Sequence, residues 1–397
     1  MVDSSLTLGG PSISRRRFLQ NAGMALAAGV VFPALIPARA LGRDGAVAPS
    51  NRVAVGVVGT GQGMSSIRRM IPFPDVEVVG VCDVDAGRVA GSVRNIEQMS
   101  GRKAAKPYSD FRELFAKAHL DAVVLAAPDH WHGVMAVMAA RAGIDIYGEK
   151  PIAHTFAEGR AIVDAVKQHG RVWQTGSWQR SVGNFRQAVE LVRNGRIGKI
   201  SYVEVGTTGD FANFKIRSAG GKLGEPPQVL DYDMWVGPAQ WQEYDPRVTH
   251  YNWRWVLNFG GGNLMDWVGH HLDIAHWAMD LDGTGPVSVS GVGEYAVSGA
   301  WDAERKYLYE CTYANGLVIK VGGEVAPGAK FFGENGKWIY VDRGKLTASD
   351  PAILKQAPAA DEYHVYRSDN HWRNFIDCVK SRSETITPAH VAHRSAT

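Results

Sequence analysis

The sequence predicts an α/β protein: a doubly wound parallel sheet in the first domain, then a second domain with a mostly antiparallel sheet. Three observations carry this prediction. A glycine-rich turn follows a buried strand near residue 59, short apolar strands alternate with helical segments up to residue 175, and later strands follow one another without helices between them. Alternating strands and helices are typical of parallel sheets, whereas consecutive strands pair antiparallel.

Length and composition indicate a folded protein with two domains. The 397 residues exceed one typical domain, and 45% hydrophobic residues suffice for a sizeable core. The net charge of +3 comes from residues 1–40, which hold four arginines and one aspartate and leave 39 basic and 39 acidic residues elsewhere. A neutral body argues against nucleic acid as a partner. Three cysteines form neither a disulfide framework nor a metal-binding spacing.

The first 40 residues read as an export signal. Ser14–Gln20 is a twin-arginine pattern, an apolar stretch follows over about 22–36, and Ala38-Arg39-Ala40 is a small-residue cleavage site. The apolar stretch is too short to span a membrane, and two prolines interrupt it. We therefore predict a Tat signal over 1–40 and a lead-in over 41–51, with no stable membrane anchor after cleavage.

A dinucleotide-binding fingerprint follows. Val53–Val58 reads as a buried strand, Gly59-Thr60-Gly61-Gln62-Gly63 as the phosphate-binding turn, and a helix runs to about Met70. The next strand, Val76–Val81, ends at Asp83, whose carboxylate is placed to accept from ribose hydroxyls. This ordered pattern predicts a Rossmann domain over 52–175.

The sequence pattern leaves two details of the fingerprint undecided, the path of the turn and the role of Asp83. The usual third glycine falls at Met64, one position after Gly63, so the path of the turn is open. Asp83 and Asp85 place two carboxylates where the 2′-phosphate of NADP would sit, with only Arg88 nearby, which favours NAD as the cofactor. A helix N-cap is the alternative role for Asp83.

The alternation continues to the end of this domain. The expected helices are 111–118, 133–142 and 157–169, and the expected strands are 122–126, 144–147 and 171–174. Ligands bind beyond the carboxyl ends of such strands, where Pro128-Asp129-His130-Trp131-His132 and Glu149-Lys150-Pro151 lie. We predict that the cofactor is held by Gly59, Gly61, Gly63, Asp83, Pro128, Asp129, His132, Glu149 and Lys150, with His132 packing against it or hydrogen-bonding it.

The second half reads as β-rich. Short alternating runs bounded by Gly and Asn turns predict strands at 200–206, 287–295, 307–313, 317–322, 330–333 and 337–341. The stretch 210–258 is rich in Gly, Pro and aromatic residues and is expected to be a long ordered loop near the active site.

Four motifs in order resemble the Gfo/Idh/MocA oxidoreductases: the glycine turn, Pro-Asp-x-x-His, Glu-Lys-Pro, and Gly260-Gly261-Gly262-Asn263 continuing into Asp266-x-x-x-His270. The leader resembles that of the exported branch. The resemblance implies that 176–397 is an α/β substrate and oligomerisation domain with a large, mostly antiparallel open sheet. It also implies a homo-oligomer, a dimer or tetramer, and a natural chain that continues beyond Thr397.

The resemblance also implies that Lys150, Asp266 and His270 carry catalysis. The residue types suit oxidation of an alcohol, because a base tuned near neutrality must take the hydroxyl proton and an amine can stabilise the developing alkoxide. On an α-helix, Asp266 and His270 would share a face, with Asp273 and His276 on nearly the same side. The alternatives are a helix cap for Asp266 and a core position for His270.

Two further readings concern the surroundings of the site. Asp129, His130 and His132, or His270, His271, Asp273 and His276, offer metal-ligand types, but neither set has a familiar metal spacing, so no metal is predicted. Aromatic residues gather between 173 and 277, where they are either core or sugar-stacking surfaces. The candidate substrate-binding residues are Gln179, Arg180 and Trp253, with a structural ion pair as the alternative for Arg180.

Export constrains the chemistry, because NAD is not freely supplied outside the cytoplasm. We expect a periplasmic or otherwise exported NAD-dependent oxidoreductase that acts on a sugar, polyol or glycoside and holds its cofactor tightly. The alternative is an NAD-dependent glycoside hydrolase that works by oxidation, elimination, water addition and re-reduction. A non-catalytic carbohydrate- or nucleotide-binding module is the competing reading from another class, and the retained Lys150, Asp266 and His270 argue against it.

Overall fold

The computed structural model describes residues 47–102, 105–207, 219–296 and 299–397, of which those from Asn51 onward pack as one compact unit. The predicted signal over 1–40 lies outside the described residues. None of the helices in the described ranges has the length and apolar character needed to cross a membrane.

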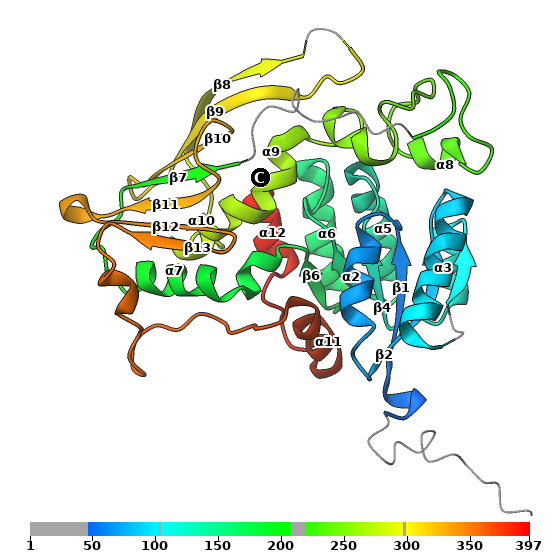
Figure 1. The fold of residues 1–397 in the computed structure, drawn as a ribbon, viewed down its shortest axis with the longest axis horizontal. Helices are drawn as coiled ribbons and strands as arrows, with labels where there is room; N and C mark the ends of the chain where they lie inside the picture. Colours follow the sequence, from blue (N-terminus) through cyan, green and yellow to red (C-terminus); the bar gives the residue numbers. More distant parts are fainter. Residues whose placement is uncertain (1–46, 103–104, 208–218, 297–298) are drawn as a thin grey trace, which may run out of the picture. The chain divides into compact units, whose positions relative to one another are not determined.

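The first half of the structure is built on a six-stranded parallel sheet (Figure 1). Its strand order is β3-β2-β1-β4-β5-β6, the doubly wound order expected from the fingerprint. The strands are β1 (Val53–Val58), β2 (Val76–Cys82), β3 (Lys106–Tyr108), β4 (Ala122–Leu125), β5 (Asp145–Gly148) and β6 (Trp173–Thr175). All five strand pairs run parallel, and the central strands are buried on both faces.

Helices cover both faces of this sheet. They are α2 (Gly63–Met70), α3 (Ala86–Ser100), α4 (Phe111–Lys117), α5 (Asp129–Arg141) and α6 (Phe156–Gln168), preceded by the short η2 (Pro49–Asn51). The sequence did not predict α3 or β3, and α5 begins four residues before the expected Gly133. Because α5 starts at Asp129, the whole Pro-Asp-x-x-His motif lies in its first turn.

The end of the chain returns to this first sheet. α11 (His371–Ser381) buries Phe375 and Ile376 with residues of β1 and β2, and α12 (Ala389–Ala396) packs beside α6 (Figure 1). The first half of the structure therefore includes residues from the end of the chain, and the boundary expected at residue 175 does not fully separate the two halves.

The second sheet has seven strands in the order β13-β12-β11-β7-β10-β9-β8. It is mostly antiparallel, as expected, with one parallel pair between β7 and β10. The strands are β7 (Tyr202–Gly206), β8 (Ser288–Tyr295), β9 (Glu304–Thr312), β10 (Val318–Gly322), β11 (Gly328–Phe332), β12 (Trp338–Asp342) and β13 (Lys345–Ala348). β13 was not predicted.

One face of the second sheet packs on helices. They are α7 (Gly183–Arg193), α9 (Gly262–Trp267), η6 (Val268–Leu272) and α10 (Asp273–Ala278), and their apolar side chains share one core with the strands. The expected loop over 210–258 contains α8 (Tyr232–Val236) and η5 (His250–Trp255) among its described residues. The described residues of the second half also hold three short 3₁₀ turns, η3 (Trp178–Ser181), η7 (Glu334–Gly336) and η8 (Ile353–Lys355).

Candidate active site

A cavity of about 1050 Å³ lies at the carboxyl ends of the first sheet's strands. One end is lined by the glycine turn and Asp83, and the other by Lys150, Asp266 and His270. Residues from both halves of the chain therefore share one space. Such a cavity at a topological switch point is the usual ligand site of a doubly wound sheet.

The glycine turn is built for a close backbone approach to a ligand. Gly59 has φ of +85°, and a Cβ there would come within 2.4 Å of the Ala126 carbonyl oxygen. Gly61 faces the cavity, with only Arg88 near its missing side chain. Gly63 begins α2 and presses against Val57, where a Cβ would lie 2.8 Å from Cγ2. Gly63 thus performs the helix-packing role of the usual third glycine, one position early.

Asp83 holds this turn in place. Its Oδ2 accepts from Thr60 N at 2.8 Å and from Thr60 Oγ1 at 2.6 Å. Its Oδ1 accepts from Asp85 N at 3.1 Å and retains acceptor capacity toward the cavity. These features fit a dinucleotide whose ribose hydroxyls donate to Asp83 and whose pyrophosphate meets the turn.

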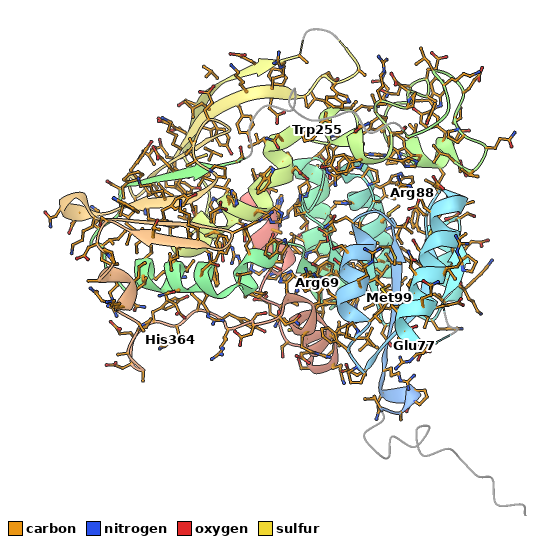
Figure 2. The ribbon with its side chains drawn as sticks, in the orientation of Figure 1. Arg69, Glu77, Arg88, Met99, Trp255 and His364 are labelled. Atoms are coloured by element: carbon orange, nitrogen blue, oxygen red, sulfur yellow. The ribbon has the colours of Figure 1, made fainter. Side chains whose placement is uncertain are left out.

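Asp85 has a different role from the one expected. It is the N-cap of α3, accepting from Arg88 N at 3.0 Å, and it faces His250 Nε2 at 3.3 Å. It does not line the cavity, whereas Arg88, which Figure 2 labels beside α3, does. The helix-capping role considered for Asp83 therefore belongs to Asp85, and of these two aspartates only Asp83 presents its carboxylate to the cavity.

Lys150 and Asp266 form the central polar contact of the cavity. Lys150 Nζ donates to Asp266 Oδ1 and to the Asp266 carbonyl oxygen, both at 2.7 Å. Arg254 Nε lies 3.3 Å from the same Oδ1. Although burial opposes ionisation, the two cations hold the pKa of Asp266 far below its usual range. Gly269 allows this approach, because a Cβ there would lie 2.9 Å from Lys150 Cβ.

His270 stands beside this pair but does not bond Asp266. Its side chain is 6% exposed, and its Nδ1 has no hydrogen-bond partner among the described residues. Burial, followed by the charges of Lys150 and Arg343, lowers the pKa of His270 well below its usual value. The imidazole is therefore neutral across the physiological pH range, and its pKa is lower than the near-neutral value expected from the sequence.

The helix that carries His270 is not a regular α-helix. Val268–Leu272 form a π-helical turn between α9 and α10, a type of turn often found at functional sites. The expectation of one continuous polar face is wrong beyond this turn. Asp273 pairs with Arg180, His276 Nε2 lies 2.8 Å from Tyr313 Oη, and neither residue lines the cavity.

Two of the three candidate substrate residues lie outside the cavity. Arg180 is buried, and its guanidinium bonds Asp273 Oδ2 and Asp282 Oδ2, both at 2.7 Å, so the structural ion pair is the role it takes. Gln179 is also buried; with its amide oriented to satisfy both neighbours, it donates to the His270 carbonyl oxygen and accepts from Arg343 Nε. Trp253 does line the cavity, with Arg254 stacked 4.5 Å from its ring centroid.

The remaining predicted cofactor residues line the same cavity. Both ring nitrogens of His132 lie against carbonyl oxygens, Pro151 O at 2.8 Å and Ala127 O at 2.9 Å, which leaves packing as its role and excludes a ring hydrogen bond to the cofactor. Burial raises the pKa of Glu149, which accepts from Ser66 Oγ at 3.3 Å. Pro128 precedes α5, and Asp129 is buried with Oδ1 unpaired within the described residues and with a pKa raised by burial.

Sequence reasoning missed two arginines of the cavity wall. Arg254 lies in η5 between two tryptophans, and Arg343 lies in the turn between β12 and β13. No motif marks either of them, because their positions depend on how the second half folds over the first. Among the described residues, no three His, Cys, Asp or Glu side chains gather as metal ligands.

Comparison with known proteins agrees with this architecture. Residues 53–177 match the profile "Oxidoreductase family, NAD-binding Rossmann fold", and residues 163–397 match "Oxidoreductase family, C-terminal alpha/beta domain", both of the Gfo/Idh/MocA type. The chain is 26% identical over 249 residues to a glycosyl hydrolase family 109 protein of Stenotrophomonas maltophilia, covering 60% of this chain and 51% of the relative.

Two further relatives carry sugar- or polyol-related names. An inositol 2-dehydrogenase of Salmonella typhimurium is 32% identical over 149 residues, covering 36% of this chain and 42% of the relative. The chain thus spans about half the length, or less, of these curated relatives. The structure of the WlbA dehydrogenase of Bordetella pertussis, in complex with NADH and UDP-GlcNAcA, superposes with a TM-score of 0.61 at 19% identity, covering 87% of this chain and 93% of that one, which bears on the fold alone.

Proposed function

Because the chain belongs to the Gfo/Idh/MocA family of oxidoreductases, with its NAD-binding Rossmann fold, we propose that it oxidises or reduces a hydroxyl-bearing carbon of a sugar, polyol or glycoside. The observation that carries this proposal is the shared cavity, which joins the glycine turn to Lys150, Asp266 and His270. NAD, when bound, exchanges a hydride with the carbon that carries the hydroxyl group.

The chain's own residues supply proton transfer and orientation. The His270 imidazole is neutral and enclosed, lines the cavity and has no ion-pair partner in the described residues, so it accepts the hydroxyl proton. The ammonium of Lys150 donates to the reacting oxygen and stabilises its negative charge. Asp266 and Arg254 position that ammonium, since Asp266 accepts from both cations.

A turnover assay tests this proposal. The purified protein, loaded with NAD in one sample and with NADH in another, is incubated with sugars, polyols and glycosides or with the corresponding carbonyl compounds. Products are identified by mass, because a tightly held cofactor releases no free NADH. We expect oxidised or reduced carbohydrate from the wild type and none from Lys150→Ala. Lys167→Ala, on the exposed side of α6, is the control that should retain turnover. A Lys150→Ala variant with full turnover would contradict the assignment.

A second candidate function is glycoside hydrolysis with NAD as a catalyst that returns to its starting state. The similarity to a glycosyl hydrolase family 109 protein favours it, as does the presence of one base and one ammonium in the cavity. Release of the aglycone without net oxidation would identify this activity, whereas a product two mass units lighter than the substrate would identify the oxidoreductase.

We also propose that the protein is exported by the Tat pathway and acts in the periplasm with tightly held NAD. The twin-arginine pattern and the small-residue site at Ala38–Ala40 support this. In a bacterial host, the double variant Arg15→Lys, Arg16→Lys should remain in the cytoplasm, while Arg17→Lys should be exported. Cell fractionation measures the outcome, and export of the double variant would contradict the proposal.

The proposed quaternary structure is a homo-oligomer, a dimer or tetramer, formed through the open face of the seven-stranded sheet. β8 supports this, because all eight of its residues are exposed, including Val289 and Val292. Light scattering after size-exclusion chromatography should give a multiple of the chain mass for wild type and a smaller mass for Val289→Lys, Val292→Lys. A monomeric wild type would contradict it.

A further inference from the structure

Arg343 is an exposed residue at the cavity wall that contacts two tryptophans and a glutamine. Its guanidinium carbon lies 4.9 Å from the ring centroid of Trp178 and 4.7 Å from that of Trp267. With the amide of Gln179 oriented as above, its Nε donates to Gln179 Oε1 at 3.0 Å. These contacts favour one orientation of the guanidinium, which lowers the entropy lost when a ligand binds.

This arginine stands next to the proposed base. Both tryptophans also contact His270, whose ring centroid lies 6.1 Å from that of Trp178 and 5.7 Å from that of Trp267. A single small molecule is therefore long enough to contact both Arg343 and the proposed base, His270. Arg343 belongs to the substrate end of the cavity and not to the glycine-turn end.

Within the described residues, no carboxylate forms an ion pair with Arg343. The adjacent Asp342 directs its Oδ1 toward His271 Nε2 at 3.5 Å and does not line the cavity. The two tryptophans lie beside the guanidinium and Gln179 occupies Nε, which leaves the two terminal nitrogens as donors in the plane of the group. A planar pair of N–H donors matches the two oxygens of a carboxylate or phosphate.

The charge balance of the substrate end points the same way. Lys150, Arg254 and Arg343 bring three cations to it, and the ionised carboxylate of Asp266 is shared by the first two. Of the other acids of the wall, Asp129 and Glu149 are buried in positions that favour their neutral forms. Asp83 bonds the glycine turn, and Asp369 pairs with Arg186 and Arg367. A cavity with excess positive charge attracts an anionic ligand.

We infer that the carbohydrate substrate carries an anionic group, a carboxylate or a phosphate, which Arg343 binds through its terminal nitrogens. The inference rests on the proposed function, since it assigns the substrate class of the same site. Arg343 then acts in binding and orientation, while Lys150 and His270 act on the reacting hydroxyl. The carboxylate of a sugar acid is the simpler match, because one guanidinium edge satisfies its two oxygens.

Calorimetric titration of the NAD-loaded protein tests this inference with matched ligands. The probes are D-glucuronate, D-glucose 6-phosphate and D-glucose, and the corresponding three compounds of the galactose series. We expect at least one anionic member to bind the wild type at least about 10-fold more tightly than its neutral counterpart, from the worth of a charged hydrogen bond. Tighter binding of the uronates identifies a carboxylate site, and tighter binding of the sugar phosphates identifies a phosphate site.

Variants assign the effect to Arg343. Arg343→Met, which keeps an unbranched apolar stem between the tryptophans, should weaken the anionic ligand about 10- to 100-fold and leave the neutral sugar unchanged. Arg343→Lys should fall between, since it retains the charge and loses the fork. Lys345→Met removes an exposed charge two residues along the chain, at the start of β13 and outside the cavity, and should change the binding of neither ligand.

Three results would overturn the inference: no anionic probe binds more tightly than its neutral counterpart, Arg343→Met weakens both equally, or Lys345→Met has the same effect as Arg343→Met. Melting temperatures of the variants separate loss of the site from loss of the fold. Failure of the proposed function has a different signature, because it leaves turnover unchanged in Lys150→Ala whichever carbohydrate binds.

Discussion

Lys150 Nζ lies 2.7 Å from Asp266 Oδ1, although 116 positions separate the two residues along the chain. Lys150 follows the fifth strand of the parallel sheet, and Asp266 lies on α9 of the second half. The contact thus joins the NAD-binding Rossmann half to the second half of the chain. Its geometry brings an ammonium, an enclosed neutral imidazole and the glycine turn to one cavity.

Replacing the acid of this pair should impair catalysis more than folding. In Asp266→Asn, Lys150 and Arg254 lose the carboxylate that orients them, so we expect kcat/KM to fall about 10²- to 10³-fold, the usual cost of a lost preorganised electrostatic contact. Steady-state assays by product mass measure this. Asp164→Asn, at an exposed acid paired with Arg160, is the matched control and should behave as wild type. Equal activity of the two variants would remove Asp266 from the site.

The pH profile should report a base with a lowered pKa. His270 must be neutral to accept a proton, and burial together with Lys150 and Arg343 lowers its pKa well below 6.5. As pH falls through 6.5, kcat/KM should therefore stay constant and decline only at lower pH. A decline centred at or above pH 6.5 would contradict this assignment. His270→Gln should lower kcat about 10²- to 10⁴-fold, the usual contribution of a positioned base.

Arg180 should matter for stability. It is 2% exposed and bonds two carboxylates, so Arg180→Met leaves Asp273 buried without its partner. Breaking a buried pair costs about 3–5 kcal/mol of the free energy of unfolding, whereas an exposed pair contributes about 0–1 kcal/mol. Denaturant unfolding followed by circular dichroism should separate Arg180→Met from Arg160→Met in this way. A loss below about 1 kcal/mol for Arg180→Met would show that the ion pair is dispensable.

Cofactor choice should depend on Asp83 and not on Asp85. Repulsion between Asp83 and a 2′-phosphate predicts at least about 10-fold tighter binding of NAD than of NADP, and Asp83→Ser should narrow that ratio. Asp85→Ser keeps a cap for α3 and lies outside the cavity wall, so the ratio should stay as in wild type. Titration calorimetry of both cofactors tests this, and a larger change in Asp85→Ser than in Asp83→Ser would reverse the assignment.

Local signals predicted most of the first sheet because they are short in range. Five of its six strands follow from short β-rich stretches between helical segments and turns, and the glycine turn marks where the protein backbone approaches the ligand. β3 was not predicted because it consists only of Lys106-Pro107-Tyr108, which contains no apolar run. α3 was not predicted because it buries only Val89, Ser92 and Ile96, so its sequence shows only a weak apolar stripe.

The sequence by itself determined five strands of the first sheet and the dinucleotide turn, since each depends on neighbours a few positions away, and its resemblance to a family pointed to the three central polar residues. Tertiary structure alone decided that Arg180 pairs with Asp273, that a π-turn places His270 in the cavity without Asp273 and His276, and that Arg343 enters between Trp178 and Trp267. These outcomes depend on which segments distant along the chain meet, and on burial, which pairs or neutralises charged groups according to what surrounds them.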